Sequence, residues 1–299
     1  MNASPRLIEE VLPATVSIYA RVPEDHPSVP ILGVERMGSG TLIEPRGLVL
    51  TVNYVLIGAQ TVQVTLLDKT NCDGEIAAQD YGSGLAAVKI RGNGFPSLTP
   101  HTSAQLKQGD EVFMVASLGE EGRRVNGGAV TSLGPFDAYW EYCLDRAVIS
   151  TAMNPGLGGG ALMDMKGRLV GVVSLNLNEV GRFSLAIPTE NFTDYKDELL
   201  RHGRRVSRPS RAWLGLYSHT FGDRIVVAGV LPGGPGETSG LKSGDVILDV
   251  NGREVSDRRQ LYDYLWSHRA GETISLRVFR NNAVHTIEVV SENVEEFFA

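Results

Sequence analysis

The sequence predicts an all-β fold built in more than one domain. From residue 6 to about residue 190, short runs rich in Val, Ile, Leu and Thr alternate with Gly, Pro, Asn and Asp, which is typical of many short strands in barrels or sandwiches. Clear examples are residues 14–19, 62–67 and 111–116. At 299 residues and 42% hydrophobic content, the chain exceeds the size at which one core usually keeps growing, so two domains are expected.

Two helices are expected to flank this β-rich part. Residues 5–12 have the pattern of a short helix, and residues 191–200 have that of a closing helix with apolar residues at helical spacing. Residues 201–211 contain five arginines among His, Gly, Ser, Val and Pro, which predicts a solvated linker; no aromatic platform accompanies them to favour a nucleic-acid patch. The expected organisation is a first domain over 1–200, a linker over 201–211, a second domain over 212–292 and a tail over 293–299.

Composition excludes several classes of function. The formal net charge of −7 argues against a nucleic-acid or anionic-membrane surface, because either needs clustered Lys and Arg, and peptides are better candidate ligands. No apolar run approaches the length of a membrane span. The six histidines show no zinc-binding spacing, and Cys72 and Cys143 are expected to be structural, so neither a metal nor a cofactor is predicted.

The amino terminus carries no recognisable export signal. Arg6, Glu9 and Glu10 fall where the apolar region of a signal peptide would have to be. A complete chain would therefore be expected in the cytoplasm, and a chain whose leader has been removed in the periplasm or another extracytoplasmic space.

The most informative stretch is a glycine-rich segment at residues 154–162, Asn-Pro-Gly-Leu-Gly-Gly-Gly-Ala-Leu. It resembles the N-P-G-N-S-G-G-P-L segment of the trypsin-like HtrA/Deg serine proteases. Aligning the flanking Asn-Pro-Gly and Gly-Gly places Gly158 where that family has its nucleophilic serine. Glycine has no side chain with which to attack a carbonyl.

The other two members of the family's Ser-His-Asp triad are also replaced. Residues 51–59 resemble the T-N-N-H-V-V-x-G-A strand end, with Tyr54 in place of the histidine. A phenol with a reference pKa of roughly 10 is a poor general base at neutral pH. Residues 84–90 resemble D-L-A-V-L-K-I, with Gly84 in place of the aspartate. Three separate alignments therefore point to a degenerate triad.

The resemblance extends over residues 6 to about 290 and implies the fold. Further matching segments are residues 38–43, 47–50, 167–173 and 184–188. In this family they belong to a chymotrypsin/trypsin-like double β-barrel of two six-stranded barrels, followed by a small α+β PDZ domain. The amino-terminal helix of the family helps to hold a trimer together, which implies a homo-oligomer here or a mixed oligomer with active relatives.

The carboxyl-terminal part resembles a PDZ domain. Trp213, Leu214, Gly215 and Leu216 resemble the carboxylate-binding loop, in which consecutive backbone N–H groups converge on the terminal carboxylate of a peptide. An extended peptide would add as a strand beside Leu216. Residues 225–230 predict a strand, residues 239–252 resemble the domain's signature segment, and their final Asn-Gly pair predicts a hairpin turn.

A helix is expected over residues 257–268 beside this loop. Leu261 and Leu265 share one face of it and are equally interpretable as core residues or as a wall of the peptide groove.

These observations predict a pseudoprotease that binds peptides or protein C-termini, as chaperone, scaffold or regulator of a complex. The turn of Gly156, Leu157 and Gly158 could still aim two N–H groups at a peptide carbonyl as a vestigial oxyanion loop. The alternative is an active HtrA-like serine endopeptidase in protein quality control. It would need a displaced nucleophile, and the upstream candidates are Cys143, Ser150 and Thr151.

The acidic tail at residues 293–299, which ends in Phe-Phe-Ala, is either a PDZ ligand for a neighbouring subunit or a frayed terminus.

Overall fold

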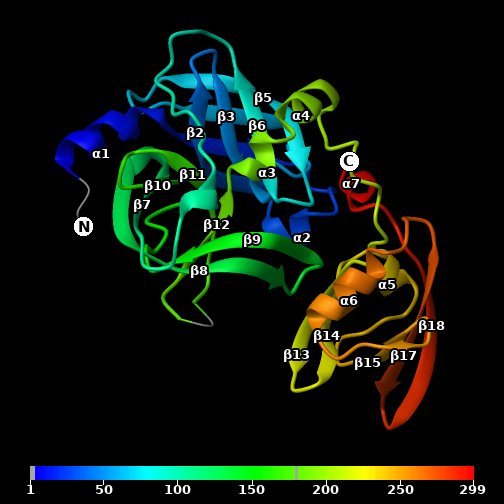
Figure 1. The fold of residues 1–299 in the computed structure, drawn as a ribbon. Coiled ribbons are helices and arrows are strands. Elements are labelled where there is room, and N and C mark those ends of the chain that lie inside the picture. The colour runs from blue at the N-terminus through cyan, green and yellow to red at the C-terminus, as the bar shows by residue number, and fades with distance from the viewer. Residues whose placement is uncertain (1–3, 179–180) are drawn as a thin grey trace. The chain divides into compact units, whose positions relative to one another are not determined.

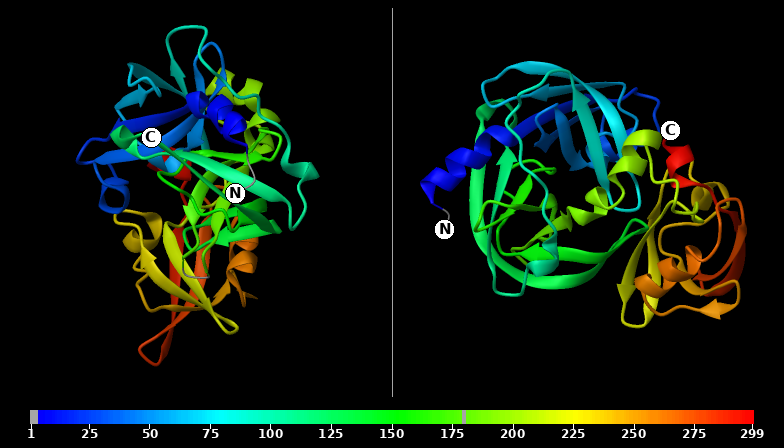
Figure 2. Two further views of the ribbon diagram at one scale, coloured as in Figure 1. Left: turned by 90° about the vertical axis from the view of Figure 1, so that its left-hand side faces the viewer. Right: turned by 45° about the horizontal axis from the view of Figure 1, so that its top comes forward.

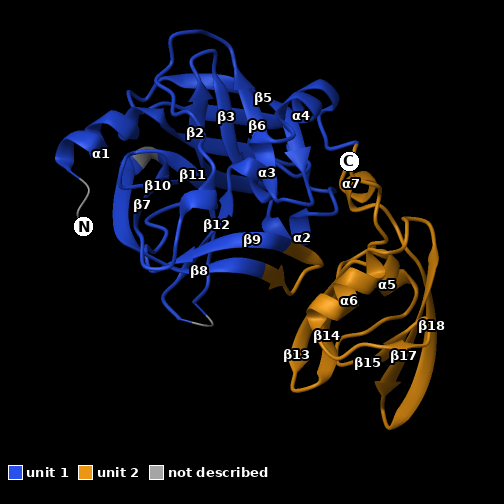
Figure 3. Cartoon of the chain, in the orientation of Figure 1, with its two compact units in different colours: residues 1–135, 144–206 blue, residues 136–143, 207–299 orange. Residues whose placement is uncertain are grey.

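The computed structural model describes residues 4–178 and 181–299, and the chain divides into two compact units (Figure 3). The first unit comprises residues 1–135 and 144–206, and the second comprises residues 136–143 and 207–299. The short segment 136–143 thus groups with the second unit, although it interrupts the first unit in sequence. The segment is rich in aromatic residues: Phe136, Tyr139, Trp140 and Tyr142.

The first unit contains two closed barrels of six strands each (Figures 1 and 2). The first barrel has the strands β1 (Thr15–Arg21), β2 (Glu35–Glu44), β3 (Leu48–Val52), β4 (Thr61–Thr65), β5 (Asn71–Asp80) and β6 (Leu85–Ile90). The second has β7 (Glu111–Ser117), β8 (Arg123–Ala138), β9 (Tyr142–Ser150), β10 (Ala161–Asp164), β11 (Leu169–Asn176) and β12 (Ser184–Pro188). Around the ring the orders are β1-β2-β3-β6-β5-β4 and β7-β8-β9-β12-β11-β10, so the two barrels share one connectivity. The expected double β-barrel is confirmed.

Side-chain patterning explains which face of each strand is buried. In β4, Val62 and Val64 are buried between the more exposed Thr61 and Gln63, which is the period-2 alternation of a strand with one solvated face. Every residue of β3 is buried, and this strand pairs with β2 on one side and β6 on the other. Both faces of β3 are therefore covered by the rest of the chain.

Short helices border the barrels. Helix α1 (Pro5–Val11) begins at Ser4, whose Oγ accepts the Leu7 N–H at 3.2 Å, and it has proline at the first helical position. The expected amino-terminal helix is thus confirmed. The remaining helical segments of this unit are η1 (Leu12–Ala14), α2 (Val29–Leu32), η2 (Asn53–Val55), η3 (Ser103–Gln105), η4 (Gly119–Glu121), α3 (Glu190–Thr193) and α4 (Lys196–His202). Within the described residues, no helix combines the length and apolar character that crossing a membrane requires.

The single closing helix expected over residues 191–200 is wrong. The chain forms α3 and α4 instead, because Tyr195 has φ −122° and ψ 12° and interrupts the helical path. Helix α4 then continues to His202 and ends at Gly203, which has the left-handed φ of 72° that favours glycine after a helix.

The second unit is built on one antiparallel sheet in the order β13-β14-β15-β17-β18, with β16 paired to β15. Its elements are β13 (Leu216–Phe221), β14 (Arg224–Val230), α5 (Pro235–Thr238), β15 (Val246–Val250), β16 (Arg253–Glu254), α6 (Arg258–Leu265), β17 (Thr273–Arg280), β18 (Ala283–Val290) and α7 (Val294–Phe297). Asn251 and Gly252, with φ of 49° and 78°, form the expected two-residue turn between β15 and β16.

Helix α6 packs on the core of this unit. It begins after Asp257, whose Oδ1 accepts the Gln260 N–H at 2.8 Å, and it ends three residues before the expected limit of His268. Leu261, Tyr262 and Leu265 are fully buried in the core, together with apolar residues of β13, β14, β15, β17 and β18. The helix and the first strand of the sheet therefore belong to one packed body.

Candidate functional site

Two of the three positions aligned with the catalytic triad lie in contact. Tyr54 is in η2, directly after β3, and Gly158 is in the turn that precedes β10. A β-carbon at position 158 would lie 1.9 Å from Tyr54 Oη, so no side chain can stand there while Tyr54 keeps its position. The tyrosine hydroxyl thus fills the space in which a nucleophile would begin.

Tyr54 is chemically unsuited to act as a base. Its hydroxyl donates a hydrogen bond to the Ser174 carbonyl oxygen at 3.1 Å, and burial raises its pKa to about 12. The phenol is therefore protonated at neutral pH and already has an acceptor.

Gly84, the third position, adjoins the same turn. Its carbonyl oxygen accepts the Asn53 N–H at 2.8 Å, and its φ is 75°. A non-glycine residue in this left-handed conformation costs roughly 1–2 kcal/mol. Aspartate is among the non-glycine residues that adopt this conformation most readily, so the backbone alone does not exclude it; what glycine removes is the carboxylate.

Arg36 supports the turn that carries Tyr54, although the sequence gives no sign of this. It is only 5% exposed, and its guanidinium donates to the carbonyl oxygens of Tyr54 at 3.1 Å and Ile57 at 2.7 Å. Its remaining donors reach the Gly33 carbonyl oxygen and Ser28 Oγ. Burial lowers the pKa of Arg36 to about 10, so it remains a cation at neutral pH.

Two of the three N–H groups of the vestigial oxyanion loop, those of Gly156 and Leu157, are already engaged. The Gly156 N–H donates to Asn154 Oδ1 at 3.2 Å, and the Leu157 N–H donates to the Ser117 carbonyl oxygen at 2.9 Å. On the other side, Ser39 Oγ donates to the Leu157 carbonyl oxygen at 2.7 Å. Presenting these N–H groups to a peptide carbonyl would require the loop to rearrange.

The three alternative nucleophiles have ordinary structural partners. Ser150 is fully buried, and its Oγ donates to the Ala152 carbonyl oxygen at 3.5 Å. Thr151 Oγ1 accepts the Ala129 N–H at 3.0 Å. Cys143 packs against the core of the second unit, and burial raises its pKa to about 12, which opposes thiolate formation.

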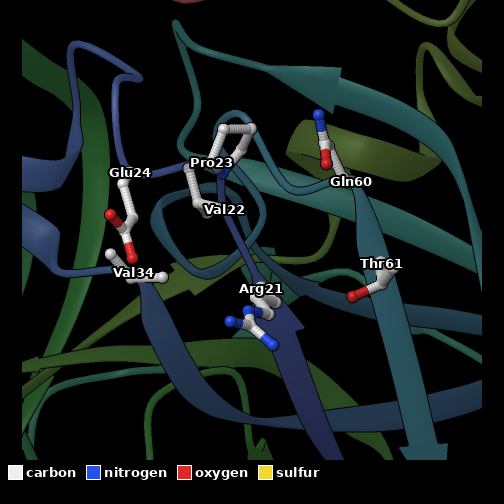
Figure 4. A pocket seen from close by; sticks show the side chains of 7 residues that line it. All are labelled: Arg21, Val22, Pro23, Glu24, Val34, Gln60 and Thr61. Atoms are coloured by element: carbon white, nitrogen blue, oxygen red, sulfur yellow. The ribbon is translucent and has the colours of Figure 1, made fainter.

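A hollow in the first barrel is lined by none of the aligned triad residues (Figure 4). It lies where β1 ends and β4 begins, and its charged side chains, Arg21 and Glu24, are of opposite sign. Its lining residues are Arg21, Val22, Pro23, Glu24, Val34, Gln60 and Thr61. None of them is a residue that the sequence singled out.

The predicted carboxylate-binding loop of the second unit holds a carboxylate. The N–H groups of Leu214, Gly215 and Leu216 donate to the carboxylate of Glu141 at 3.1, 2.8 and 3.3 Å. Burial raises the pKa of Glu141 to about 7, and the three N–H bonds act in the opposite direction. The acceptor comes from the segment 136–143, within the same compact unit.

Trp213, Leu261 and Leu265 do not join the loop donors. The Trp213 N–H donates to the Glu292 carbonyl oxygen at 3.1 Å, and its ring packs on Phe297 and Phe298 at centroid distances of 5.0 and 5.8 Å. Leu261 and Leu265 are fully buried in the core. On α6, the Tyr262 hydroxyl accepts the Glu141 N–H at 2.9 Å. Arg258, for which the sequence predicts no role, donates through Nη1 to the Ser218 carbonyl oxygen at 3.2 Å.

The fold and this loop define a trypsin-like double barrel followed by a PDZ domain. Residues 38–172 match the family described as trypsin-like peptidase domain, and residues 198–290 match the PDZ domain family. The chain belongs to the HtrA family and is homologous to its serine endoproteases.

Similar proteins include two that are named probable periplasmic serine endoprotease DegP-like. The one from Marinomonas sp. (strain MWYL1) is 32% identical over 274 residues, which are 86% of this chain and 57% of that protein. The one from Ectopseudomonas mendocina (strain ymp) is 30% identical over 280 residues, 88% of this chain and 57% of that protein. The chain therefore spans somewhat more than half the length of these relatives.

Two solved structures have the same fold over nearly the whole chain. The HtrA-type protease AlgW with a tripeptide has a TM-score of 0.59 and 26% identity, covering 96% of this chain and 95% of that one. The serine endoprotease from Yersinia pestis has a TM-score of 0.58 and 24% identity, covering 97% of each chain.

Proposed function

We propose that this chain is a catalytically inactive HtrA-family protein that binds peptides or protein C-termini through its PDZ domain. The observation that carries the proposal is the convergence of the Leu214, Gly215 and Leu216 N–H groups on one carboxylate. The same three donors suit the terminal carboxylate of a peptide. The chain would then work as a chaperone, a scaffold or a regulator of a complex.

Inactivity is supported by the contact between the first two triad positions. Tyr54 Oη lies where a side chain at position 158 would start, and burial keeps this hydroxyl protonated by raising its pKa. Removing a whole serine-protease triad lowers turnover by roughly a millionfold. What remains from the binding site alone is too slow to serve as proteolysis.

Similar proteins of the family support the proposed peptide binding and the proposed assembly into oligomers. The solved AlgW structure carries a tripeptide, which supports a peptide ligand for this chain. A trimer of this chain, or a mixed oligomer with active relatives, follows from the resemblance of the amino-terminal helix and fits a regulatory role.

The alternative function is an active endopeptidase, because the similar proteins are named serine endoproteases. The test is exposure of the full chain to a fluorophosphonate probe and to unfolded casein, with an active DegP-like relative as positive control. We expect neither labelling nor cleavage. Labelling mapped to Ser150 or Thr151, together with cleavage of casein, would establish the alternative instead.

Peptide binding is tested by isothermal titration of the full chain with peptides that end in a free apolar residue and with their amidated forms. The wild type and the Glu141→Ala variant are both titrated, since Glu141 occupies the loop donors in the folded chain. Binding by either protein that amidation abolishes supports the proposal. If neither protein binds, the PDZ domain is not a reader of C-termini.

A further inference from the structure

A segment of the chain lies along the PDZ domain between β13 and α6. The Ser218 N–H on β13 donates to the Tyr139 carbonyl oxygen at 2.8 Å. From α6, the Tyr262 hydroxyl donates to the Ala138 carbonyl oxygen at 3.0 Å and accepts the Glu141 N–H at 2.9 Å. The main chain of residues 138–141 is therefore bonded on both sides, as that of a bound peptide would be.

The order of these contacts is that of a peptide lying antiparallel to β13, although residues 139–141 form the turn between β8 and β9 and share one main-chain hydrogen bond with β13. Glu141 meets the loop at Leu216, and Tyr139, two residues earlier, meets Ser218, two residues later on β13. The two chains thus run in opposite directions, with one residue between successive contacts on each. At the end of this turn, the side-chain carboxylate of Glu141 takes the place that a terminal carboxylate would occupy.

Glu141 also explains how a continuous chain can imitate a chain end. Its φ is 37°, in the left-handed region that residues other than glycine rarely adopt. This bend carries the main chain on to Tyr142, where β9 begins, while the carboxylate stays in the loop. A true C-terminus needs no such bend, so it would occupy the loop without this backbone strain.

Arg258 binds an acidic side chain, that of Asp137, four residues before Glu141. Arg258 Nε donates to Asp137 Oδ2 at 2.6 Å, and its Nη2 donates to the Asp137 carbonyl oxygen at 2.9 Å. The same guanidinium donates through Nη1 to the Ser218 carbonyl oxygen at 3.2 Å. Arg258 therefore joins the segment to both α6 and β13.

Aromatic contacts add to the recognition. The Tyr139 ring lies 5.9 Å from the Tyr217 ring and 5.7 Å from the His219 ring, measured between centroids, on the side of β13. The titratable or charged side chains that surround the Glu141 end of the segment are thus Asp137 and Tyr139 from the segment, Tyr217 and His219 from β13, and Arg258 and Tyr262 from α6.

We propose that residues 137–141 are an internal ligand of the PDZ domain, and that the external partner is a protein C-terminus that displaces them. The contacts of Asp137 and Tyr139 define its chemistry: an acidic residue four positions, and an aromatic residue two positions, before a free terminal carboxylate. This inference rests on the proposed peptide-binding function. It adds that the chain's own residues 137–141 fill the peptide groove until an external C-terminus displaces them.

The probe for the test is a fluorescent peptide, Gly-Pro-Phe-Asp-Ala-Tyr-Trp-Val, with a free carboxyl terminus, and its amidated twin. It copies residues 134–140 and ends in an apolar residue. Binding to the full chain is measured by fluorescence anisotropy for the wild type, Glu141→Ala and the matched control Asp145→Asn, which removes one acidic group from an exposed site on β9. Circular dichroism checks that each variant is folded.

We expect Glu141→Ala to bind the probe at least about tenfold more tightly than the wild type, because a groove that is open only a fraction of the time weakens apparent affinity by that fraction. Asp145→Asn should bind like the wild type, and amidation should abolish binding. Equal binding by wild type and Glu141→Ala would overturn the internal ligand while leaving peptide binding in place. No binding by either would overturn both.

Two further measurements keep the inference open to refutation if Glu141→Ala folds poorly. Glu141→Gly removes the carboxylate and suits the left-handed φ of 37° at this position, so it should also bind the probe more tightly than the wild type. Hydrogen exchange needs no ligand: the amides of Gly215 and Leu216 should exchange faster in Glu141→Gly than in the wild type, because their acceptor is removed. Unchanged exchange and unchanged binding in this variant would contradict the proposal.

Discussion

The contact between Tyr54 and position 158 makes Gly158→Ser a sensitive test of the degenerate site. The new β-carbon would lie 1.9 Å from Tyr54 Oη and 3.1 Å from both Tyr54 Cζ and the Ser174 carbonyl oxygen. The ring must move and give up its hydrogen bond to Ser174. Overpacking of this kind costs about 1–3 kcal/mol and a lost hydrogen bond about 1 kcal/mol, so a total of about 2–4 kcal/mol is expected.

The assay is urea unfolding of the full chain, followed by signals from the first unit. Tyr54→Phe removes only the hydroxyl oxygen, so the double variant Tyr54→Phe/Gly158→Ser should be less destabilised than the sum of the single variants by at least about 1 kcal/mol. Gly134→Ser is the matched control, because nothing lies within 4 Å of a β-carbon at that position in β8. It should change stability by less than about 0.5 kcal/mol.

The reasoning would be refuted if Gly158→Ser were as harmless as Gly134→Ser, or if the costs of Tyr54→Phe and Gly158→Ser simply added. Either result would mean that the tyrosine hydroxyl does not fill the place of the missing side chain. Activity should not return in Gly158→Ser in any case, since the pKa of Tyr54, raised to about 12, leaves the serine without a base.

Three further predictions concern the rest of the chain. Arg36→Met should lower the free energy of unfolding by about 2–4 kcal/mol in a denaturation curve, because the buried carbonyl oxygens of Tyr54 and Ile57 lose their donor. Burial raises the pKa of Glu141 to about 7, so Glu141 docks most strongly in the PDZ loop in acid, and its docking weakens as the carboxylate ionises. The affinity of the wild type for the peptide should therefore rise roughly tenfold between pH 5.5 and 8. The affinity of Glu141→Gln should not change with pH in this way. Deleting residues 297–299 should leave the oligomer mass in light scattering unchanged but lower the melting temperature, because Phe297 and Phe298 pack on Trp213 within their own unit.

Much of the fold is predictable because its signals are local. Alternation such as that of Val62 and Val64 marks strands, Ser4 and Pro5 mark the start of α1, and Asn251-Gly252 marks a hairpin. The closing helix was mispredicted for a related reason: apolar spacing over residues 191–200 is compatible with one helix, and the break at Tyr195 carries no proline or glycine to announce it.

The candidate sites also contain some residues that the sequence predicts and others that it does not. The loop of Leu214, Gly215 and Leu216 is expected from the resemblance of residues 213–216 to the carboxylate-binding loop of PDZ domains, in which the donors are backbone N–H groups of adjacent residues. Arg258 could not be assigned to the groove, because helical spacing alone does not say which polar residue of α6 faces β13. That the chain is inactive, and that its partners are C-termini, stay predictions for the experiments above.

By itself, the sequence determined that the chain is mostly β, that it belongs to the HtrA family, and that tyrosine and two glycines stand where the triad is aligned. Only the tertiary structure decided that the Tyr54 hydroxyl fills the space beside Gly158 and that Glu141 occupies the PDZ loop. The physical reason is separation along the chain: Glu141 and Gly215 are 74 residues apart, and no local propensity or periodicity encodes which carboxylate meets those N–H groups. That choice is made by the path of the folded chain.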